Sequence, residues 1–407
     1  MSNIRLVEDH KPATDGNARF TVIGVGGGGG NAVEHMVRSG VRGVSFICAN
    51  TDQQALATMS APKIIQLGVQ STRGLGAGAN PQKGREAAIE EEGAIREALQ
   101  GSDMVFVTAG MGGGTGTGAA PVVAQIAKEM GILTVGVVTT PFAFEGRRRS
   151  RAAEQGIKEL AEQVDSLIII PNEKLLTVYG DITMVEALKK ADDVLLNAVR
   201  SIFDLIINHG QINLDFADLK TAMSTRGFAM MGIGSARGNN RAQQAAEMAI
   251  SSPLLDNIRL ENAKGVLINI TGGEEFKLRE VQEISDIVGQ IADLDEGDVF
   301  YGTVIDPTMS GDEITVTVIA TGLSREEPGT QAPVRQHAAA PAAPARHTGL
   351  SSPARSNVVA PVVEEDEDDL PAISRRSAAP VREEPAPASA ERKPQFTVQD
   401  FLKRQQR

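Results

Sequence analysis

Apolar runs of six to eight residues recur along the first half of the chain, and helical patterns separate them. The runs are apolar throughout instead of alternating with polar residues, which is typical of strands buried on both faces of a parallel sheet. Helical spacing follows the first run at 31–40 and the third at 121–131. The pattern predicts an α/β fold with a parallel sheet, whose expected strands are 20–26, 43–50, 103–109, 133–140 and 166–171.

A long helix is predicted after this sheet. Apolar residues recur every three or four positions from Met184 to Asn208, and Gly210 marks its end. A helix of that length would measure roughly 37 Å. It separates two blocks of different pattern, so we expect a connecting helix that packs against both.

The second block, from about residue 213 to 323, has a different order of elements. Two strands end it in succession, which predicts an antiparallel pair in a smaller α+β domain. The expected strands are 228–238, 265–273, 298–306 and 313–323, and the expected helices are 240–250 and 277–294.

Both ends of the chain differ from the blocks between them. Residues 1–18 are polar and carry no apolar signal core, so we expect a disordered arm without a secretory signal. Eleven of the 19 prolines lie between Pro328 and Pro394, which predicts a disordered linker over 324–393. Apolar and basic residues return in 394–407, as in a peptide that folds on a partner.

Composition narrows the class of protein. The net charge of −12 over 407 residues argues against a general nucleic-acid binder. Cys48 is the only cysteine, which excludes a disulfide framework and is consistent with a reducing compartment; we expect a small core residue there. Five histidines and one cysteine lack the spacing of a zinc site. No apolar run is long enough to span a bilayer. We therefore expect a soluble cytoplasmic protein.

The stretch Gly110–Gly118 holds six glycines in nine residues, directly between an expected strand and an expected helix. Glycine lets a backbone approach a phosphate closely, and the N–H groups and dipole of a helix N-terminus favour anions. Thr115 and Thr117 add hydroxyl groups, whereas the lysine of a P-loop is absent. The alternative is a tight packing turn, but the number of glycines favours phosphate binding.

A second glycine-rich stretch begins at Gly24, directly after the first expected strand. Gly24, Gly26 and Gly29 fit a GxGxxG pattern, and Asp52 stands near the end of the next strand, as in dinucleotide-binding domains. Two glycine segments at neighbouring strands suit one triphosphate better than one pyrophosphate. An NAD-dependent oxidoreductase and a nucleotide-binding scaffold without turnover remain alternatives.

Other candidates follow the ends of expected strands, where ligands bind in open α/β sheets. Glu145 and Arg149 follow one strand and Asn172 follows another. Taken singly, the charged run from Arg147 to Arg151 would form a solvated face, and Asn172 would cap a helix. Asp192, on the long helix, would be an exposed charge.

Asp215 and Asp218 are spaced to share one helix face. They either cap the helix and complement its dipole or orient an attacking water.

The stretches GVGGGGGNAV, GMGGGTGTGAAP, PFAFEGRRR, PNEKLL and NLDFADL, in this order, closely resemble the FtsZ family of bacterial cell-division GTPases, which is related to tubulin. The resemblance covers about residues 20–323. It implies a tubulin-like GTP-binding domain over 19–183, a connecting helix over 184–210 and an α+β domain over 211–323. It also implies head-to-tail polymerisation into filaments that form the cytokinetic ring, in the cytoplasm at the inner face of the membrane.

The resemblance also assigns roles to residues. It implies that Asp215 and Asp218 act on the GTP of the neighbouring subunit, while Glu145 and Arg149 contact the ribose side. Asn172 and Asp192 would read guanine, and Leu188 stands where many members have phenylalanine. The implied phosphate-binding residues are Gly27, Gly28, Gly29, Gly30, Asn31, Gly113, Gly114, Thr115, Gly116 and Thr117. Mg²⁺ is expected with the nucleotide.

The resemblance finally implies partners for the end of the chain. Phe396, Phe401, Leu402 and Lys403 would bind membrane-anchoring and regulatory division proteins, without direct insertion into the membrane. Thr397 and Gln399 stand roughly where the family peptide carries aspartate and proline.

Overall fold

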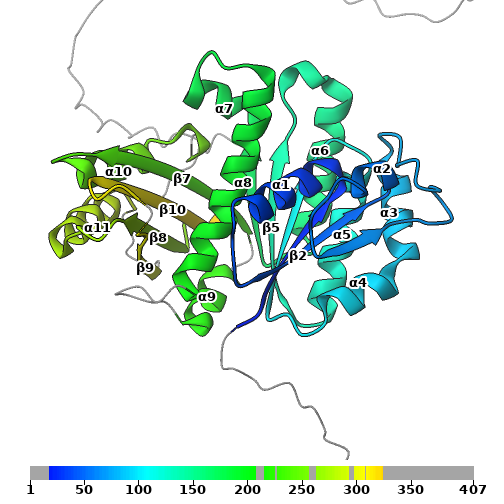
Figure 1. Ribbon diagram of the computed structural model, residues 1–407, viewed down its shortest axis with the longest axis horizontal. Helices are drawn as coiled ribbons and strands as arrows, with labels where there is room; N and C mark the ends of the chain where they lie inside the picture. Colours follow the sequence, from blue (N-terminus) through cyan, green and yellow to red (C-terminus); the bar gives the residue numbers. More distant parts are fainter. Residues whose placement is uncertain are drawn as a thin grey trace, which may run out of the picture. The chain divides into compact units, whose positions relative to one another are not determined.

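One ten-stranded sheet runs through the described part of the chain (Figure 1). Its strand order is β3-β2-β1-β4-β5-β6-β7-β10-β8-β9. The strands are β1 (Phe20–Val25), β2 (Val44–Asn50), β3 (Lys63–Gln66), β4 (Met104–Gly110), β5 (Leu133–Thr140), β6 (Ser166–Pro171), β7 (Gly227–Arg237), β8 (Gly265–Gly272), β9 (Asp298–Ile305) and β10 (Glu313–Leu323).

Eleven α-helices and two short 3₁₀ turns accompany these strands in the described residues. They are α1 (Gly26–Arg38), α2 (Gln53–Leu56), α3 (Pro81–Glu90), α4 (Glu92–Leu99), α5 (Thr115–Glu129), η1 (Ala143–Glu145), α6 (Arg147–Ala161), α7 (Asn172–Tyr179), α8 (Met184–Ile207), α9 (Phe216–Met223), α10 (Arg241–Ile250), η2 (Pro253–Leu255) and α11 (Leu278–Ala292).

The computed structural model describes residues 18–207, 215–224, 227–255, 263–292, 298–307 and 309–323. The predicted arm (apart from Ala18), linker and C-terminal peptide lie outside these residues, and the peptide's Phe396, Phe401, Leu402 and Lys403 lie outside them as well. The domain boundaries proposed from the sequence stay predictions.

Strand direction divides the sheet into two ends. Strands β1 to β6 are parallel, β7 is parallel to β6, and β8 and β9 run the same way; β10 alone is antiparallel to its neighbours. The carboxyl ends of nine strands therefore lie together, and we call this side the carboxyl end of the sheet. The opposite side, where these strands begin, is the amino end.

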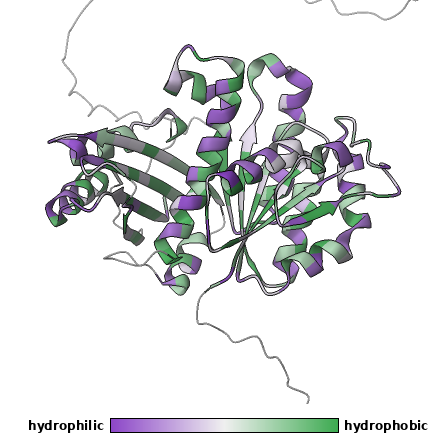
Figure 2. Cartoon of the chain, viewed as in Figure 1, coloured by the Kyte–Doolittle hydropathy of each residue, from purple (hydrophilic) through white to green (hydrophobic). Residues whose placement is uncertain are grey.

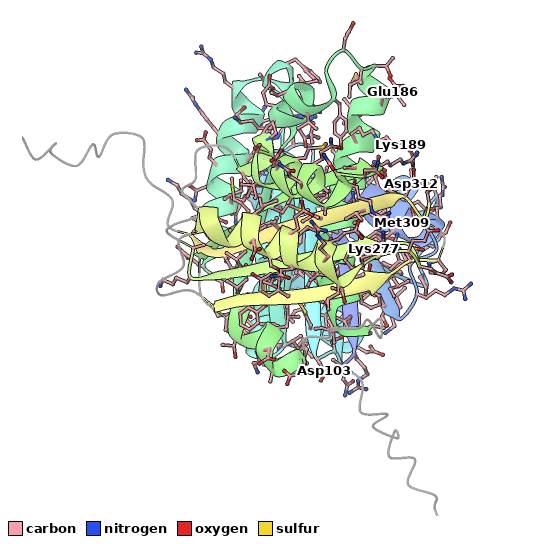
Figure 3. The ribbon with its side chains drawn as sticks, turned by 90° about the vertical axis from the view of Figure 1, so that its left-hand side faces the viewer. Asp103, Glu186, Lys189, Lys277, Met309 and Asp312 are labelled. Atoms are coloured by element: carbon pink, nitrogen blue, oxygen red, sulfur yellow. The ribbon has the colours of Figure 1, made fainter. Side chains whose placement is uncertain are left out.

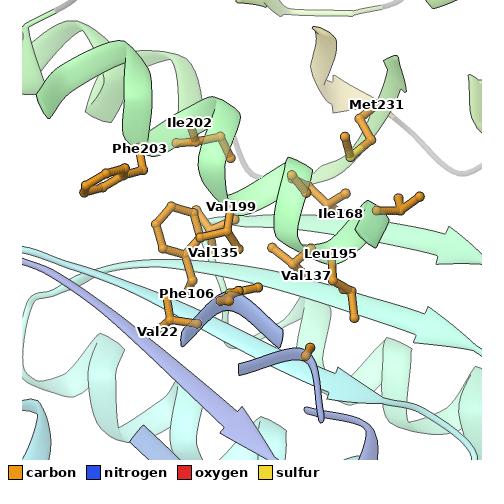
Figure 4. Close-up of a cluster of buried hydrophobic side chains, with 14 of the residues drawn as sticks. Val22, Phe106, Val135, Val137, Ile168, Leu195, Val199, Ile202, Phe203 and Met231 are labelled. Atoms are coloured by element: carbon orange, nitrogen blue, oxygen red, sulfur yellow. The ribbon is translucent and has the colours of Figure 1, made fainter. Parts of the chain in front are cut away.

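Alternating side chains of the strands build a core on each face. Val22, for example, belongs to a cluster that includes side chains of α1 and α8, whereas its neighbour Ile23 belongs to a cluster with α3, α4, α5 and α6. Figure 4 shows Leu195, Val199 and Ile202 of α8 against strand side chains of the first cluster. Figure 2 shows the matching hydrophobic colour along the strands. This burial on both faces confirms the parallel sheet predicted from the uninterrupted apolar runs.

Helix α8 confirms the long helix predicted from Met184, and it ends at Ile207 within the described residues. Its side chains share one core with strands from both halves of the sheet, including Val137 of β5 and Ile319 of β10. The hydroxyl of Ser201 also donates to Thr317 Oγ1 of β10 at 3.1 Å. On the opposite face, α10 and α11 cover β7, β8 and β10.

The predicted antiparallel pair of the last two strands is wrong. Strand β9 pairs with β8 in parallel, and β10 lies between β7 and β8. From Val316 to Leu323 every residue of β10 is buried, as a strand with two neighbours and two covered faces requires. Strands β9 and β10 follow each other along the chain but are not neighbours in the sheet.

The glycine segments also differ from the prediction, which treated them as loops. Helix α1 begins at Gly26 and α5 begins at Thr115, so much of each segment forms the first turns of a helix. Cys48 is buried, as expected for a core residue. Burial raises the pKa of its thiol to about 11. No helix in the described residues is long and apolar enough to cross a membrane.

Candidate functional site

The first glycine segment opens α1 at the carboxyl end of β1. Gly27 and Gly28 are exposed, and a Cβ added at Gly27 would meet nothing within 4 Å. A Cβ at Gly29 would instead lie 2.3 Å from the carbonyl oxygen of Thr108. Gly29 therefore allows close packing of α1 on β4, while Gly27 leaves room at the helix N-terminus. The first turn of α1 carries no acidic residue, which suits an anion.

The second glycine segment joins β4 to α5 and shows the same division. Gly113 has open space at its Cβ position, whereas a Cβ on Gly116 would lie 2.5 Å from the carbonyl oxygen of Gly110. Thr115 Oγ1 lies 2.6 Å from Thr51 Oγ1, and Thr117 Oγ1 accepts from the amide of Gly112 at 2.9 Å. Both hydroxyls thus make hydrogen bonds within the chain and support the turn. The packing interpretation of this segment therefore applies to Gly116, whereas the phosphate interpretation applies to Gly113.

The two glycine segments touch each other. A Cβ on Gly26 would lie 2.7 Å from the amide nitrogen of Gly116, and one on Gly28 would lie 3.1 Å from the Cα of Gly110. The N-termini of α1 and α5 therefore meet at one place. Two helix dipoles and two sets of unpaired N–H groups favour an anion with several oxygens there.

Glu145 and Arg149 lie beside this place, after β5. They form an ion pair with each other, and Glu145 Oε1 accepts from the amide of Phe142 at 2.9 Å. A Cβ on Gly112 would lie 2.9 Å from the carbonyl oxygen of Arg149, so α6 begins against the second glycine segment. The Arg149 side chain is half exposed and stays accessible to a ligand.

Asn172 is the first residue of α7, at the carboxyl end of β6. It is 6% exposed, and its Oδ1 atom has no hydrogen-bond partner in the structure. The helix-cap alternative is wrong, because Pro171 occupies the cap position and no side chain caps this helix. A buried carbonyl oxygen without a donor is costly, and a ligand N–H group would satisfy it.

Asp192 of α8 is half-buried, in contrast to the exposed charge that its sequence context suggested. Burial raises the pKa of its carboxyl to about 6, while the nearby His35 opposes this shift and Asp193 adds to it. His35 of α1 forms a hydrogen bond to Asp193, with 2.8 Å between Nε2 and Oδ1. Sequence reasoning missed His35, because 158 positions separate it from its partner. Leu188, also on α8, is 45% exposed.

Asp215 and Asp218 lie elsewhere. Both are exposed, and Asp215 caps α9 by accepting from the amide of Asp218 at 2.7 Å. The ring of Phe216 lies 6.2 Å from that of Phe20, the first residue of β1, and Thr321 near the end of β10 donates to the carbonyl of Ala222. Helix α9 therefore lies at the amino end of the sheet, and Figures 1 and 3 show it at the side opposite α7 and Glu186.

Asp52 does not complete a dinucleotide site. Its Oδ1 atom accepts from the amides of Gln54 at 2.9 Å and Ala55 at 3.2 Å, so it caps α2. Gly24 of the GxGxxG pattern lies inside β1, where a Cβ would be 2.2 Å from the carbonyl oxygen of Gly29. Among the described residues, no group of three histidine, cysteine or acidic side chains could hold a metal ion.

Two family descriptions match most of the described chain. The GTPase domain of the Tubulin/FtsZ family matches residues 19–180, and the C-terminal domain of the FtsZ family matches residues 227–324. A family of GTPases excludes both alternatives left open by the sequence, the oxidoreductase and the scaffold without turnover.

Individual relatives agree with these matches. The chain is 56% identical over 336 residues to "Cell division protein FtsZ" of Azotobacter vinelandii, which covers 81% of this chain and 85% of that protein. It is 59% identical over 303 residues to the protein of the same name from Pseudomonas putida, covering 74% and 76%. A solved structure titled "FtsZ dimer, empty" from M. jannaschii matches with a TM-score of 0.72 and 43% identity, covering 75% of this chain and 88% of that one. The chain, with its tubulin-like fold and its paired glycine segments, belongs to the FtsZ family of cell-division GTPases and hydrolyses GTP.

Proposed function

We propose that this GTPase polymerises head to tail and that each active site is completed between two subunits. GTP binds at the carboxyl end of one sheet, and Asp215 and Asp218 at the amino end of the next subunit orient the attacking water. The observation that carries this proposal is the position of α9, at the end of the sheet opposite the glycine segments.

The distance between the two ends makes contact within one subunit impossible. Strand β1 has six residues and runs from Phe20, beside α9, to Val25, directly before the first glycine segment. At about 3.3 Å per residue this strand alone spans roughly 20 Å. A carboxylate must approach within hydrogen-bond distance of the water that it orients. This separation supports the proposal that Asp215 and Asp218 act on the nucleotide of another subunit.

Residues at the carboxyl end share the contacts to GTP. The backbone of Gly27–Asn31 and of Gly113–Thr117 binds the phosphates at the two helix N-termini. Glu145 and Arg149 contact the ribose side, next to the second glycine segment. Asn172 and Asp192 read guanine, whose N1–H and 2-amino groups both donate; the unpartnered Oδ1 atom of Asn172 supports this role.

Mg²⁺ enters with the nucleotide in this proposal. The described residues supply no cluster of three ligating side chains, and Mg²⁺ commonly binds through phosphate oxygens and water. When bound, the ion would neutralise charge on the transferring phosphoryl group. The chain's own contribution is positioning: the glycine turns fix the phosphates, and the two acids of the neighbouring subunit fix the water.

A head-to-tail contact joins two different surfaces, so it can repeat from subunit to subunit, and it produces a filament when the repeat does not close into a ring. The M. jannaschii structure is titled a dimer, and the relatives are named cell division proteins, which supports self-association in division. We propose that such filaments form the cytokinetic ring on the cytoplasmic side of the membrane at the division site.

The C-terminal peptide, residues 394–407, binds the anchoring and regulatory proteins in this proposal, and residues 324–393 act as its tether. The residues that make these contacts are Phe396, Phe401, Leu402 and Lys403. The domain limits given above, at 19–183, 184–210 and 211–323, belong to the same proposal.

Phosphate release measured against protein concentration tests the shared site. We expect the specific rate per subunit to rise steeply above a threshold concentration, because isolated subunits lack the acids of a neighbour. A specific rate that stays constant down to concentrations where light scattering detects no filaments contradicts the shared site.

A further inference from the structure

A chain of polar contacts joins three helices on one face of the sheet. His35 Nε2 of α1 lies 2.8 Å from Asp193 Oδ1 of α8. Lys190 Nζ donates to the other oxygen of Asp193 at 3.2 Å, and the same ammonium lies 5.0 Å from the ring centroid of Tyr179 at the end of α7. Because an ionised carboxylate only accepts, Nε2 of His35 carries the proton. The contacts therefore run from α1 through α8 to α7.

These three helices carry both ends of the proposed nucleotide site. Helix α1 begins with the glycine turn for the phosphates, α7 begins with Asn172, and α8 carries Asp192 directly before Asp193. A nucleotide bound in one conformation has a defined distance between its phosphates and its base. The base-reading carboxylate must therefore stand at a fixed distance from the glycine turn.

Much of the surface between α1 and α8 is apolar. Val33 and Met36 of α1 share an apolar cluster with Ala191 and Leu195 of α8. The packing of these side chains holds the two helices at a defined separation and crossing angle. The bond between His35 and Asp193 adds a directional contact with a preferred length and angle, and it lies directly beside Asp192.

We propose that His35 and Asp193 are positioning residues for guanine recognition: their hydrogen bond sets α8, and with it Asp192, at the correct distance from the phosphate-binding turn of α1. This inference rests on the proposed role of Asp192. Lys190 holds the second oxygen of Asp193, so the carboxylate of Asp193 stays turned toward α1. The charge of Lys190 also offsets that of Asp193 beside the base-reading carboxylate.

The ratio of the affinities for GTP and ITP measures this positioning directly. ITP lacks only the 2-amino group of guanine, so every effect on the phosphate and ribose contacts cancels from the ratio. A hydrogen bond to a charged group discriminates by about tenfold or more. We expect the wild type to prefer GTP by at least that factor, and Asp193→Ala and His35→Ala each to lose most of the preference.

Three further variants separate positioning from a general loss of structure. Asp193→Asn keeps an oxygen that can accept from His35, so we expect it to retain most of the preference. The double variant His35→Ala/Asp193→Ala should lose no more of the GTP preference than either single variant, because each single variant already removes the same hydrogen bond. Arg38→Ala is the matched control, since Arg38 bonds only Glu34 within α1 among the contacts described, and its GTP to ITP ratio should equal that of the wild type.

The outcomes distinguish this inference from the proposed function. If Asp192→Ala loses the preference while Asp193→Ala and His35→Ala keep it, the positioning role is wrong and the base-reading role stands. If Asp192→Ala keeps the wild-type ratio, base reading by Asp192 is wrong, and the positioning role falls with it. If the double variant loses the sum of the two single-variant losses in GTP preference, His35 and Asp193 do not act through one shared bond, and the positioning role is wrong.

Discussion

The two ends of one sheet carry different chemistry. At the carboxyl end, helices α1, α5, α6 and α7 begin after strands, and two glycine segments are in contact. The first N–H groups of a helix have no acceptor within it. At the amino end, α9 presents two exposed carboxylates. A parallel sheet places every strand-to-helix turn at the same end, so anion sites collect there. The acids at the other end lie too far away to use that site within one molecule.

The difference also shows in how each end holds its polar groups. The Oδ1 atom of Asn172 and the carboxyl of Asp192 are withdrawn from solvent at the carboxyl end, and burial raises the pKa of Asp192. Asp215 and Asp218 stay exposed, so their ionised forms cost little desolvation. In the proposed function, the carboxyl end encloses the nucleotide, and the amino end presents its carboxylates to the nucleotide of a neighbouring subunit.

The largest effect is expected from neutralising the acids at the amino end. Asp215→Asn and Asp218→Asn should each lower GTP turnover by about a hundredfold or more, because the attacking water loses its orienting group. Asparagine is also a good helix cap, so Asp215→Asn should leave α9 intact. GTP affinity in dilute monomer should not change. Stopped turnover with normal binding, measured by phosphate release and equilibrium titration, supports the division between the two ends.

Mixing two impaired variants sharpens this test. Asp218→Asn can bind GTP but lacks an acid, while Gly113→Ser retains both acids and carries little nucleotide when GTP is kept below its raised dissociation constant. Equimolar mixtures should recover part of the activity where the GTP of one variant meets the acids of the other. A mixture no more active than its parts, or Asp218→Asn with weakened GTP binding as a monomer, places the acids in their own subunit's site.

The next largest effect should come from the open glycines at the carboxyl end. Gly27→Ala and Gly113→Ser add atoms where the structure leaves room, so both variants should fold. The new side chains would stand between the backbone and a phosphate, and we expect GTP affinity to fall about tenfold, roughly the loss of one charge-assisted hydrogen bond. Gly93→Ala in α4 is the matched control, because its Cβ position is equally open but remote from the site. Unchanged GTP affinity in Gly113→Ser would return that segment to a packing role.

The sequence predicted the parallel part of the sheet well, because its strands are continuous apolar runs buried on both faces. It also predicted α8, whose spacing persists from Met184 to the end of the helix. The convergence of both glycine segments followed from their positions after β1 and β4. The place of β10 did not follow, since pairing in a sheet depends on packing across the whole face.

Three other features were not predicted, each for a different physical reason. Helix α3 and the other short elements between β2 and β4 have weak apolar periodicity. The glycines at the start of α1 have low helix propensity, so the sequence did not predict a helix there. The helix forms because Gly29 packs against the carbonyl of Thr108, where no side chain would fit. The pair of His35 and Asp193 is created only by folding, so no local pattern signals it.

A smaller effect is expected from the pH dependence of base recognition at the carboxyl end. In the proposed site, guanine binds the ionised carboxyl of Asp192, whose pKa burial raises to about 6. Affinity for GTP should therefore be flat above pH 7 and should fall below pH 6, approaching tenfold per unit of pH. Asp192→Asn should show a narrower preference for GTP over ATP and should lack this decline. Competition of GTP and ATP at pH 5 to 8 measures both; His35 is present in both proteins, so the difference isolates Asp192.

The smallest effect concerns Asp204, the second carboxyl of α8 with a raised pKa. Burial raises its pKa to about 6, against the opposing influence of Arg200, whose Nε donates to Asp204 at 3.2 Å. Between the ordinary pKa near 3.8 and this value, the folded protein binds the proton more tightly than the unfolded chain does. Protonated Asp204 therefore adds stability at low pH, and this contribution is lost as the pH rises through 6.

Asp204→Asn cannot ionise, so its melting temperature should gain on that of the wild type between pH 4.5 and 7. Between these two pH values the contribution of the raised pKa changes by about 2 kcal/mol, or a few degrees in a protein of this size. GTP affinity should stay unchanged, because Asp204 lies in the C-terminal half of α8, whereas Asp192 lies in the half that carries the base-reading role. Scanning calorimetry at both pH values measures the difference. A gap in melting temperature that is equal at pH 4.5 and 7 contradicts the buried titration, and a loss of GTP affinity would mean that the two carboxyls of α8 are not separate in function.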